Sequence, residues 1–363
     1  MIGTVQLGLL AACVVVLVPM GLAGWHLSRN KMLFFGGALF ISLAVAVHLF
    51  PYFPSLSSFI PDASSFSSSS VVILKNRDSC LPLLHEIEWN EENYGYNRSV
   101  LSWGWGRSDG SVIACDFQKL RKYDARDLLN GSWVMVAGDS QARLFVLSLL
   151  NVMLGEEEME SVRRHLFKRH SNYQAVVDGV EMKLDFIWAP YVTNLIDLIV
   201  DLSNNKSCPD VLVMGTGLWH MLHITNSTDY GMSLQRLHRS LMSFLMPVSL
   251  EFGAGPDLVS VSARPRAHLF WLGMPMLINS MLNTEEKREK MTNETQDAYN
   301  DSLHGSKLLH QSQGPFLLLD IHALSKNCGV HCTEDGMHYS EIVYEAAVQI
   351  TLNALLIESQ QKL

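Results

Sequence analysis

This sequence of 363 residues has no excess of basic side chains, and its cysteines and histidines lack the spacing of a zinc finger. Lysine and arginine number 27 against 36 aspartates and glutamates, which gives a net charge of −9. Nucleic-acid-binding domains normally carry a basic patch or stripe, so nucleic acid is excluded as the expected partner. The sequence contains no internal repeat. Its length suits one large domain with appendages, and 48% hydrophobic residues suffice for a sizeable core.

Cysteine is scarce: there are six, of which Cys13 lies in the first apolar run. The other five are Cys80, Cys115, Cys208, Cys328 and Cys332. Because five is odd, one thiol must stay outside the intramolecular disulfides, and the spacing does not give the pairing. The segment Cys328–Cys332 has no second ligand pair at zinc-like spacing. In an oxidising compartment a disulfide or a structural loop is therefore expected there rather than a metal site.

Charge is absent from the first apolar run, residues 2–25, and the second, residues 32–50, carries only His48. Each run is long enough to span a bilayer. Arg29 and Lys31 lie between them and favour the cytoplasm. We expect either a membrane hairpin or a single anchor, with the first run as a signal-like segment or a cytosolic extension. Both place the rest of the chain in the lumen. A cleaved signal peptide is disfavoured because no charged segment precedes the first run.

The stretch 53–75 is rich in serine and proline, a composition that cannot build a core and that predicts a flexible stem. With residues 1–52 as the membrane anchor, residues 76–363 form the predicted lumenal domain. All Asn-x-Ser/Thr sequons follow the apolar runs, which indicates a glycosylated domain. They lie at Asn97, Asn130, Asn205, Asn226, Asn293 and Asn300.

The candidate nucleophile lies where the sequence changes its pattern. Trp133–Ala137 is an apolar, β-rich run, Gly138-Asp139-Ser140 is a turn, and helix formers continue to Met153. A strand, a tight turn and a helix place Ser140 at the carboxyl end of a strand and at a helix N-terminus, where free N–H groups favour negative charge. A nucleophilic serine with an oxyanion beside it needs that setting. By itself, Gly-Asp-Ser is also ordinary turn chemistry.

A second motif, Asp335-Gly-Met-His338, precedes the final helical stretch, for which Ser340 is the expected N-cap. An imidazole has its usual pKa near neutrality, so His338 suits the base that takes the Ser140 proton, while Asp335 orients the ring. An α/β-hydrolase separates its aspartate and histidine more widely and has Gly-x-Ser-x-Gly, whereas position 142 is alanine. The sequence therefore predicts a Ser-His-Asp triad of another type.

This pairing of motifs resembles the SGNH/GDSL superfamily. From Cys80 to Leu356 the chain resembles the PC-esterase branch, which includes the plant trichome-birefringence-like polysaccharide O-acetyltransferases and the sialate O-acetyltransferases. Within that branch it is most similar to the plant Altered Xyloglucan type. Trp103-Gly-Trp-Gly-Arg107, followed by Cys115, resembles the segment before the Gly-Asp-Ser block in the trichome-birefringence-like proteins. Its tryptophans either pack in a core or contact carbohydrate.

The resemblance implies an O-acetyltransferase that acetylates cell-wall polysaccharides of the xyloglucan or xylan class through an acetyl-serine intermediate. It implies no cofactor, only an acetyl donor as co-substrate, and a separate membrane protein is expected to deliver the acetyl equivalents. Anchor and stem are typical of Golgi glycan enzymes, so a Golgi membrane location is expected, with the catalytic domain in the lumen. The alternative is a carbohydrate O-acetylesterase that uses the same triad with water. A non-catalytic glycan-binding protein is a third hypothesis, against which the intact triad argues.

The remaining site candidates depend on matches to the family. The block Val213–His220 has no asparagine after Gly215, and in this it departs from the wider superfamily. Its Gly217-Leu-Trp219 is similar to the Gly-x-Trp of the trichome-birefringence-like proteins. Gly215 and Trp219 are therefore oxyanion-hole or substrate-binding candidates, beside the backbone N–H of Ser140. Arg143 matches the family arginine three residues after the nucleophile. Three roles are open for Arg143: it could bind the acyl carbonyl, brace the turn, or form an ion pair on the helix.

Two further points stay open at this stage. His220 and His223 are either structural or line the acceptor cleft. After His338 the chain continues Tyr-Ser-Glu, where the trichome-birefringence-like proteins have Trp-Cys-Leu-Pro-Gly, and this is closer to the sialate pattern. The departure leaves the acceptor sugar undefined.

Alternating patterns predict an α/β fold: an SGNH-like, doubly wound parallel sheet of about five strands in flavodoxin-like order, with helices on both faces. We expect strands, after the one that leads to Ser140, at residues 182–188, 211–214, 268–272 and 316–320. We expect helices at residues 193–202, 233–246, 284–309 and 341–356.

Overall fold

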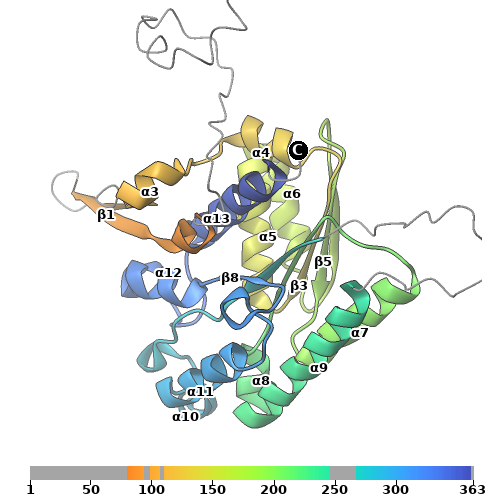
Figure 1. The fold of residues 1–363 in the computed structure, drawn as a ribbon. Helices are drawn as coiled ribbons and strands as arrows, with labels where there is room; N and C mark the ends of the chain where they lie inside the picture. Colours follow the sequence, from red (N-terminus) through yellow and green to blue (C-terminus); the bar gives the residue numbers. More distant parts are fainter. Residues whose placement is uncertain (1–79, 94–98, 107–109, 246–266, 361–363) are drawn as a thin grey trace, which may run out of the picture. The chain divides into compact units, whose positions relative to one another are not determined.

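The sheet that carries the candidate site has six strands in the order β4-β5-β3-β6-β7-β8 (Figure 1). The computed structural model describes residues 80–93, 99–106, 110–245 and 267–360, all within the unit Val72–Leu363. Both apolar runs, the Ser-rich stem and Asn97 lie outside these residues. Within the described ranges, no helix combines the length and the apolar character needed to cross a membrane.

Five of the six strands are parallel, and their order along the sheet is second, first, third, fourth, fifth, which confirms the predicted flavodoxin-like order. They are β3 (Trp133–Gly138), β5 (Met182–Trp188), β6 (Val211–Gly215), β7 (His268–Leu272) and β8 (Leu317–Leu319). The expectation of about five strands is wrong by one. β4 (Tyr173–Val177) pairs antiparallel with β5 at the edge of the sheet.

Side chains of the central strand β3 alternate between two cores. Val134 and Val136 pack into one core, whereas Met135 and Ala137 pack into the other. This alternation follows from the two-residue period of a strand, and it means that both faces of the sheet are covered. Burial on both faces therefore explains why the sequence of β3 has no polar residue among its apolar ones.

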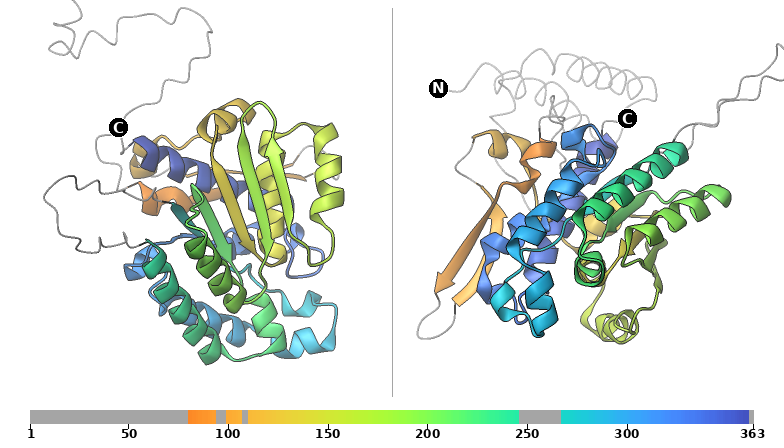
Figure 2. Two further views of the ribbon diagram at one scale, coloured as in Figure 1. Left: turned by 90° about the vertical axis from the view of Figure 1, so that its right-hand side faces the viewer. Right: turned by 90° about the horizontal axis from the view of Figure 1, so that it is seen from below.

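Helices cover both faces, as predicted (Figures 1 and 2). One core includes residues of α5 (Ser140–Met153), α6 (Glu156–Leu166), α12 (Ile321–Cys328) and α13 (Glu341–Gln360). The other includes residues of α7 (Val192–Asn204), α8 (Leu218–His223), α9 (Ser227–Leu245) and α11 (Asn293–His304). The stretch at residues 284–309 is mostly helical, as predicted, but it is divided in two: α10 (Glu285–Lys290) ends before Thr292, whose side chain accepts a hydrogen bond from Thr295 N and starts α11.

An antiparallel ribbon of β1 (Ile87–Asn93) and β2 (Ser99–Trp105) lies beside α12, on the far side from α7 and α9 (Figure 2). The Cys80–Cys115 disulfide joins the start of η5 (Leu81–His85) to the end of α3 (Gly110–Cys115). Trp103 is buried beneath Lys119 and donates to Glu345 of α13. Of the two alternatives, the core role therefore holds for Trp103.

The remaining short elements connect these layers. They are α4 (Lys122–Leu128), η6 (Asn279–Met281), η7 (His310–Ser312) and η8 (Val330–Cys332).

Candidate active site

Ser140 is the first residue of α5 and lies two residues beyond Gly138, the carboxyl end of β3. Asp139 is the N-cap, and its Oδ1 accepts a hydrogen bond from Gln141 N at 3.0 Å. The turn before it needs glycine: a Cβ on Gly138 would lie 2.1 Å from the carbonyl oxygen of Gly215 on β6. A Cβ on Gly215 would lie 2.4 Å from Leu272 O on β7. Three strand ends thus converge behind the nucleophile.

The structure brings the three predicted triad residues together. Ser140 Oγ lies 2.8 Å from His338 Nε2, and His338 Nδ1 lies 2.6 Å from Asp335 Oδ2. Because a carboxylate can only accept, the proton on the ring belongs on Nδ1, which leaves Nε2 free to accept from the Ser140 hydroxyl. This is the hydrogen-bonded chain that activates a serine nucleophile. Ser140 and His338 thus lie within hydrogen-bond reach, as the predicted triad requires.

Asp335 and His338 lie in one compact turn, and hydrogen bonds within that turn fix the orientation of the Asp335 carboxylate. Asp335 Oδ1 accepts from the backbone N–H groups of Met337 at 3.0 Å and His338 at 2.7 Å. Partial burial acts to raise the pKa of Asp335, but these hydrogen bonds and the one to the His338 ring outweigh it and hold the pKa below its usual value. Thr333 Oγ1 donates to His338 O at 2.8 Å. The carboxylate is thus held in place, and it stays ionised to a lower pH than an ordinary aspartate.

A second set of hydrogen bonds ties this turn to the helix that carries the nucleophile. Gln141 Nε2 donates to Met337 O at 3.0 Å, and the hydroxyl of Tyr344 on α13 donates to Gln141 Oε1. Both Gln141 and Tyr344 are buried. The side chain that follows Ser140 therefore fixes the distance between nucleophile and base, a role that sequence patterns did not indicate.

Arg143 lies one turn after Ser140 and is only 8% exposed. Its Nε and Nη2 atoms are buried and find no hydrogen-bond partner among the described residues, and no ion pair of Arg143 occurs there. The ion pair on the helix, one of the three alternatives, is thus not seen. Burial lowers the pKa of its guanidinium, while the nearby Asp139 acts in the opposite direction. Buried donors without a partner are rare in folded proteins, so these two N–H groups call for a functional explanation.

Asp139 is the other buried charge beside the nucleophile. It is 1% exposed, and burial raises its pKa to about 6, although the hydrogen bond from Gln141 N and the charges of His338 and Arg143 act to lower it. Asp139 and Arg143 are thus two buried ionisable groups at the N-terminal end of α5, close enough to influence each other's pKa but not joined by an ion pair.

The structure places Gly215 beside Gly138 at the carboxyl edge of the sheet and Trp219 on α8. Trp219 belongs to an aromatic cluster, which consists of His170, Trp188, Tyr191, Trp219 and His223. The cluster borders the site, because the Trp188 ring centroid lies 4.9 Å from the Arg143 guanidinium carbon. Sequence reasoning missed His170, Trp188 and Tyr191. The available signal was that Trp188 ends a strand at the same sheet edge as Ser140.

The two histidines of α8 differ in their surroundings. His220 is buried between the Tyr299 hydroxyl at 2.7 Å and Asp229 Oδ2 at 3.0 Å, which supports the structural alternative. His223 is exposed and contacts the Trp219 ring at 5.1 Å, so it belongs to the aromatic cluster.

Cys328 and Cys332 form a disulfide just before the Asp335–His338 turn, and Cys332 O accepts from Ser340 N at 2.6 Å. The disulfide is one of the two alternatives left open for this segment. Cys208 belongs to neither disulfide, as the odd cysteine count predicts. Four sequon asparagines are exposed, namely Asn130, Asn205, Asn226 and Asn293, and Asn300 is half-buried within α11.

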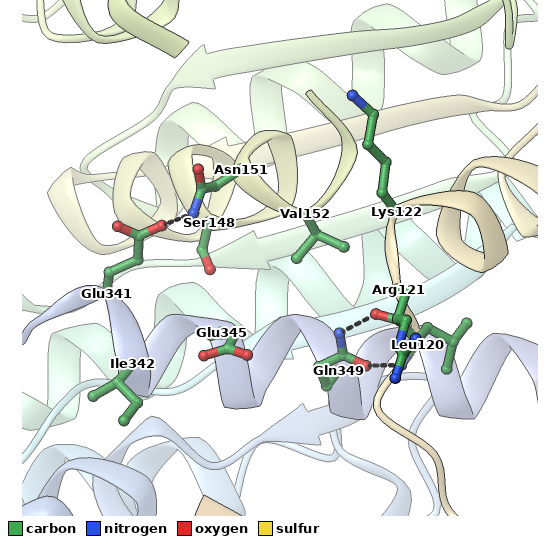
Figure 3. Close-up of a pocket in the computed structure, with 10 residues that line it drawn as sticks. All are labelled: Leu120, Arg121, Lys122, Ser148, Asn151, Val152, Glu341, Ile342, Glu345 and Gln349. Carbon is green, nitrogen blue, oxygen red and sulfur yellow. Dashed lines mark hydrogen bonds between the residues drawn. The ribbon is translucent and has the colours of Figure 1, made fainter. Parts of the chain in front are cut away.

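A polar pocket of about 500 Å³ lies between α4, α5 and α13 and includes none of the triad residues (Figure 3). Its polar groups largely satisfy one another. Gln349 exchanges hydrogen bonds of 2.7 and 2.8 Å with the Leu120 backbone, and Asn151 donates to Glu341. The Gln349 contacts hold α13 against the segment before α4, and the Asn151 contact holds it against α5, so these groups of the pocket serve helix packing.

No protein-family model matches the chain. Among solved structures, TesA is 14% identical, with 63% of this chain and 98% of that chain covered and a TM-score of 0.33. An acetylxylan esterase from Geobacillus stearothermophilus, Axe2, is 12% identical, with 66% and 96% covered and a TM-score of 0.35.

Among proteins of known name, the chain is 53% identical to Protein ALTERED XYLOGLUCAN 9 of Arabidopsis thaliana. The alignment spans 378 residues and covers 100% of both chains. An identity of this size over the whole length identifies the relationship, and it agrees with the type suggested by the two motifs. The chain belongs to the family of ALTERED XYLOGLUCAN 9.

Proposed function

We propose that this protein is an O-acetyltransferase that acetylates cell-wall polysaccharide of the xyloglucan or xylan class through an acetyl-Ser140 intermediate. The observation that carries the proposal is the continuous hydrogen-bonded chain from Ser140 Oγ through His338 to Asp335. The name of the relative and the aromatic cluster beside the site support the polysaccharide, because aromatic side chains offer flat apolar faces to sugar rings.

The reaction is a double displacement. His338 Nε2 takes the proton of Ser140 as its Oγ attacks the acetyl carbonyl, and the protonated ring then gives that proton to the leaving group. In the second half, the same nitrogen deprotonates a sugar hydroxyl that attacks the ester, and Ser140 recovers its proton. Asp335 keeps the ring in the required tautomer and stabilises the imidazolium throughout.

The negative charge on the carbonyl oxygen needs donors that are already in place. The backbone N–H of Ser140 lies at the N-terminus of α5, where free N–H groups and the helix dipole favour an anion. Arg143 adds two buried N–H groups without partners among the described residues, one turn away. We assign the oxyanion to this end of α5, with Arg143 taking the part of the asparagine that is missing after Gly215.

A carbohydrate O-acetylesterase is the second candidate, and one observation favours it. The side chains of His338 and Asp335 are 37% and 38% exposed, so water can approach the base. Transferase and esterase share the acyl-enzyme and differ only in what removes the acetyl group. A transferase must hold the ester until a sugar hydroxyl is positioned, since bound hydroxyls gain from effective molarity.

The test separates the two by partitioning. Full-length protein in detergent is acetylated on Ser140, confirmed by mass spectrometry, and then chased with buffer alone or with xyloglucan or xylan oligosaccharides. The proposal expects a stable ester in buffer, faster loss with oligosaccharide, and an acetylated sugar product. Rapid loss in buffer with no acetylated sugar assigns the protein as an esterase instead.

The proposed location is the Golgi membrane, with the domain after residue 75 in the lumen. Four exposed sequon asparagines in the described residues support it. Endoglycosidase treatment of protein from microsomes should lower its apparent mass. An unshifted band, together with protease sensitivity of the domain in sealed vesicles, would place the domain on the cytosolic side.

A further inference from the structure

A basic segment lies close to the aromatic cluster in a chain that is acidic overall. From Arg163 to Arg169 the sequence reads Arg-Arg-His-Leu-Phe-Lys-Arg, in a chain of net charge −9. The helix dipole accounts for part of it, because α6 has three glutamates in its first turn and Arg163, Arg164 and His165 in its last. That explanation stops where the helix stops. Lys168 and Arg169 lie beyond α6, in the 167–172 loop, and both are exposed.

The topology of the sheet brings this loop to the nucleophile. The loop ends at Tyr173, where β4 begins, and Tyr173 pairs with Phe186 near the carboxyl end of β5. In β5 Trp188 pairs with Gly138, two residues before Ser140. The 167–172 loop and the nucleophile thus share one edge of the sheet.

Three contacts fix the loop at that edge. Asn172 Oδ1 accepts from Trp188 N at 2.8 Å, and the His170 ring stacks on the Trp188 ring with centroids 4.9 Å apart. The Phe167 ring centroid lies 5.8 Å from the guanidinium carbon of Arg143. Lys168 and Arg169 are therefore presented from a segment anchored before and after them.

Within the described residues, no carboxylate forms an ion pair with Arg143, Lys168 or Arg169. Three cations thus belong to this edge of the sheet: Arg143, with unpartnered buried N–H groups, and the exposed Lys168 and Arg169, whose neighbours Phe167 and His170 contact Arg143 and Trp188. Such a set fits a ligand whose neutral acyl end reaches Ser140 and whose far end carries several negative charges. A neutral polysaccharide would not require these positive charges.

We propose that the 167–172 loop binds the phosphate groups of an acetyl thioester that acylates Ser140. The inference rests on the proposed function and names the chemical class of its donor. In the step, Ser140 Oγ forms a bond to the acetyl carbon, the carbon–sulfur bond breaks, and the sulfur leaves as a thiol with the proton relayed by His338. Lys168 and Arg169 hold the leaving portion through its phosphates and take no part in the bond changes.

The test compares two donors that share the thioester and differ in phosphate. Full-length protein in detergent is mixed with acetyl-CoA or with acetyl-pantetheine, which lacks the nucleotide, and the rate of acetyl-Ser140 formation is followed against donor concentration. Wild type should half-saturate at a lower concentration of acetyl-CoA, and added salt should remove that advantage. The double variant Lys168→Gln/Arg169→Gln should raise the half-saturating concentration of acetyl-CoA about tenfold, as fits two exposed charges, and leave acetyl-pantetheine unchanged.

Arg236→Gln/Arg239→Gln is the matched control, since it removes two exposed charges from α9 and should leave both donors unchanged. Equal half-saturation of wild type by the two donors would overturn the proposal. So would a charge effect seen only with a uronic-acid-bearing acceptor in the second half-reaction, or only in binding to vesicles of anionic lipid. If no donor acetylates wild-type Ser140, the proposed function itself fails, and that result differs from acylation that ignores the loop.

Discussion

The buried carboxylate of Asp139 makes a quantitative prediction about stability. Burial raises its pKa from the usual 3.8 to about 6, whereas in the unfolded chain it is solvated. The folded protein therefore binds this proton more tightly than the unfolded protein does. Stability from this group is present at low pH and is lost as pH rises from about 4 to above 6.

Asp139→Asn removes the titration and keeps the oxygen that accepts from Gln141 N. Over the full range, a shift of about two pH units is worth about 3 kcal/mol, and about 2 kcal/mol of this falls between pH 4.5 and pH 8. Asp139→Asn should therefore gain stability relative to wild type as pH rises. The free energy of unfolding of the variant minus that of wild type should be larger at pH 8 than at pH 4.5 by about 2 kcal/mol. Any loss of attraction to Arg143 in the variant shifts the baseline and leaves this pH difference as the readout.

Urea unfolding followed by tryptophan fluorescence at the two pH values measures it, with Asp210→Asn as a control on an exposed aspartate that accepts from Trp133 N. The control shows what the same substitution does at a carboxylate on the surface. If Asp139→Asn also gives an equal difference at pH 4.5 and pH 8, the carboxylate is not buried as the structure has it, and the electrostatic account of the nucleophile's N-cap is refuted.

Three further predictions concern the site and its support. Asp335→Asn should leave the melting temperature near that of wild type but slow acylation by roughly 10⁴-fold, because the imidazole loses the carboxylate that sets its tautomer; a loss below tenfold contradicts the triad. Gly138→Ala should destabilise the fold by 3 kcal/mol or more, on the order of the largest overpacking penalties, since its methyl would meet Gly215 O at 2.1 Å, and a normal melting curve speaks against the close strand approach. Removal of the Cys80–Cys115 disulfide should cost about 4 kcal/mol for a 35-residue loop, measured by urea unfolding of a double serine variant, and an unchanged midpoint contradicts the pairing.

The parallel strands were predictable because most are short, largely buried apolar runs, and Met182–Trp188, where Lys183 is exposed, alternates as a strand does. Met182–Trp188 and His268–Leu272 have the predicted bounds. β4 was missed because it is an edge strand of five residues, Tyr173–Val177, in which only Val177 is fully buried, so its pattern lacks a continuous apolar face. The break before Thr292 was missed although a threonine cap is visible in the sequence, because polar residues on both sides continued the helical composition.

The triad was predictable for a different reason: Asp335 and His338 are neighbours in the chain, and Ser140 lies in a short recognisable turn. The surroundings of the triad depend on tertiary packing. His170 and Trp188 are 18 residues apart, and only the antiparallel pairing of β4 with β5 brings the loop back to the strand end. The unpartnered N–H groups of Arg143 likewise follow from which side chains surround it, which a sequence match to a family arginine does not give.

The turn that holds the base has a consequence for biosynthesis. All six strands of the sheet are complete by Leu319, whereas His338 and α13 come later in the chain. Because Tyr344 of α13 holds Gln141, and Gln141 in turn holds the His338 turn, the spacing between nucleophile and base is set only when α13 docks on α5. While the chain is still being made, a folded sheet presents Ser140 as an unactivated alcohol. Reactivity therefore requires the last helix: a chain clipped before α13 lacks both the contact that sets the spacing of the triad and the buried residues that complete one core of the sheet.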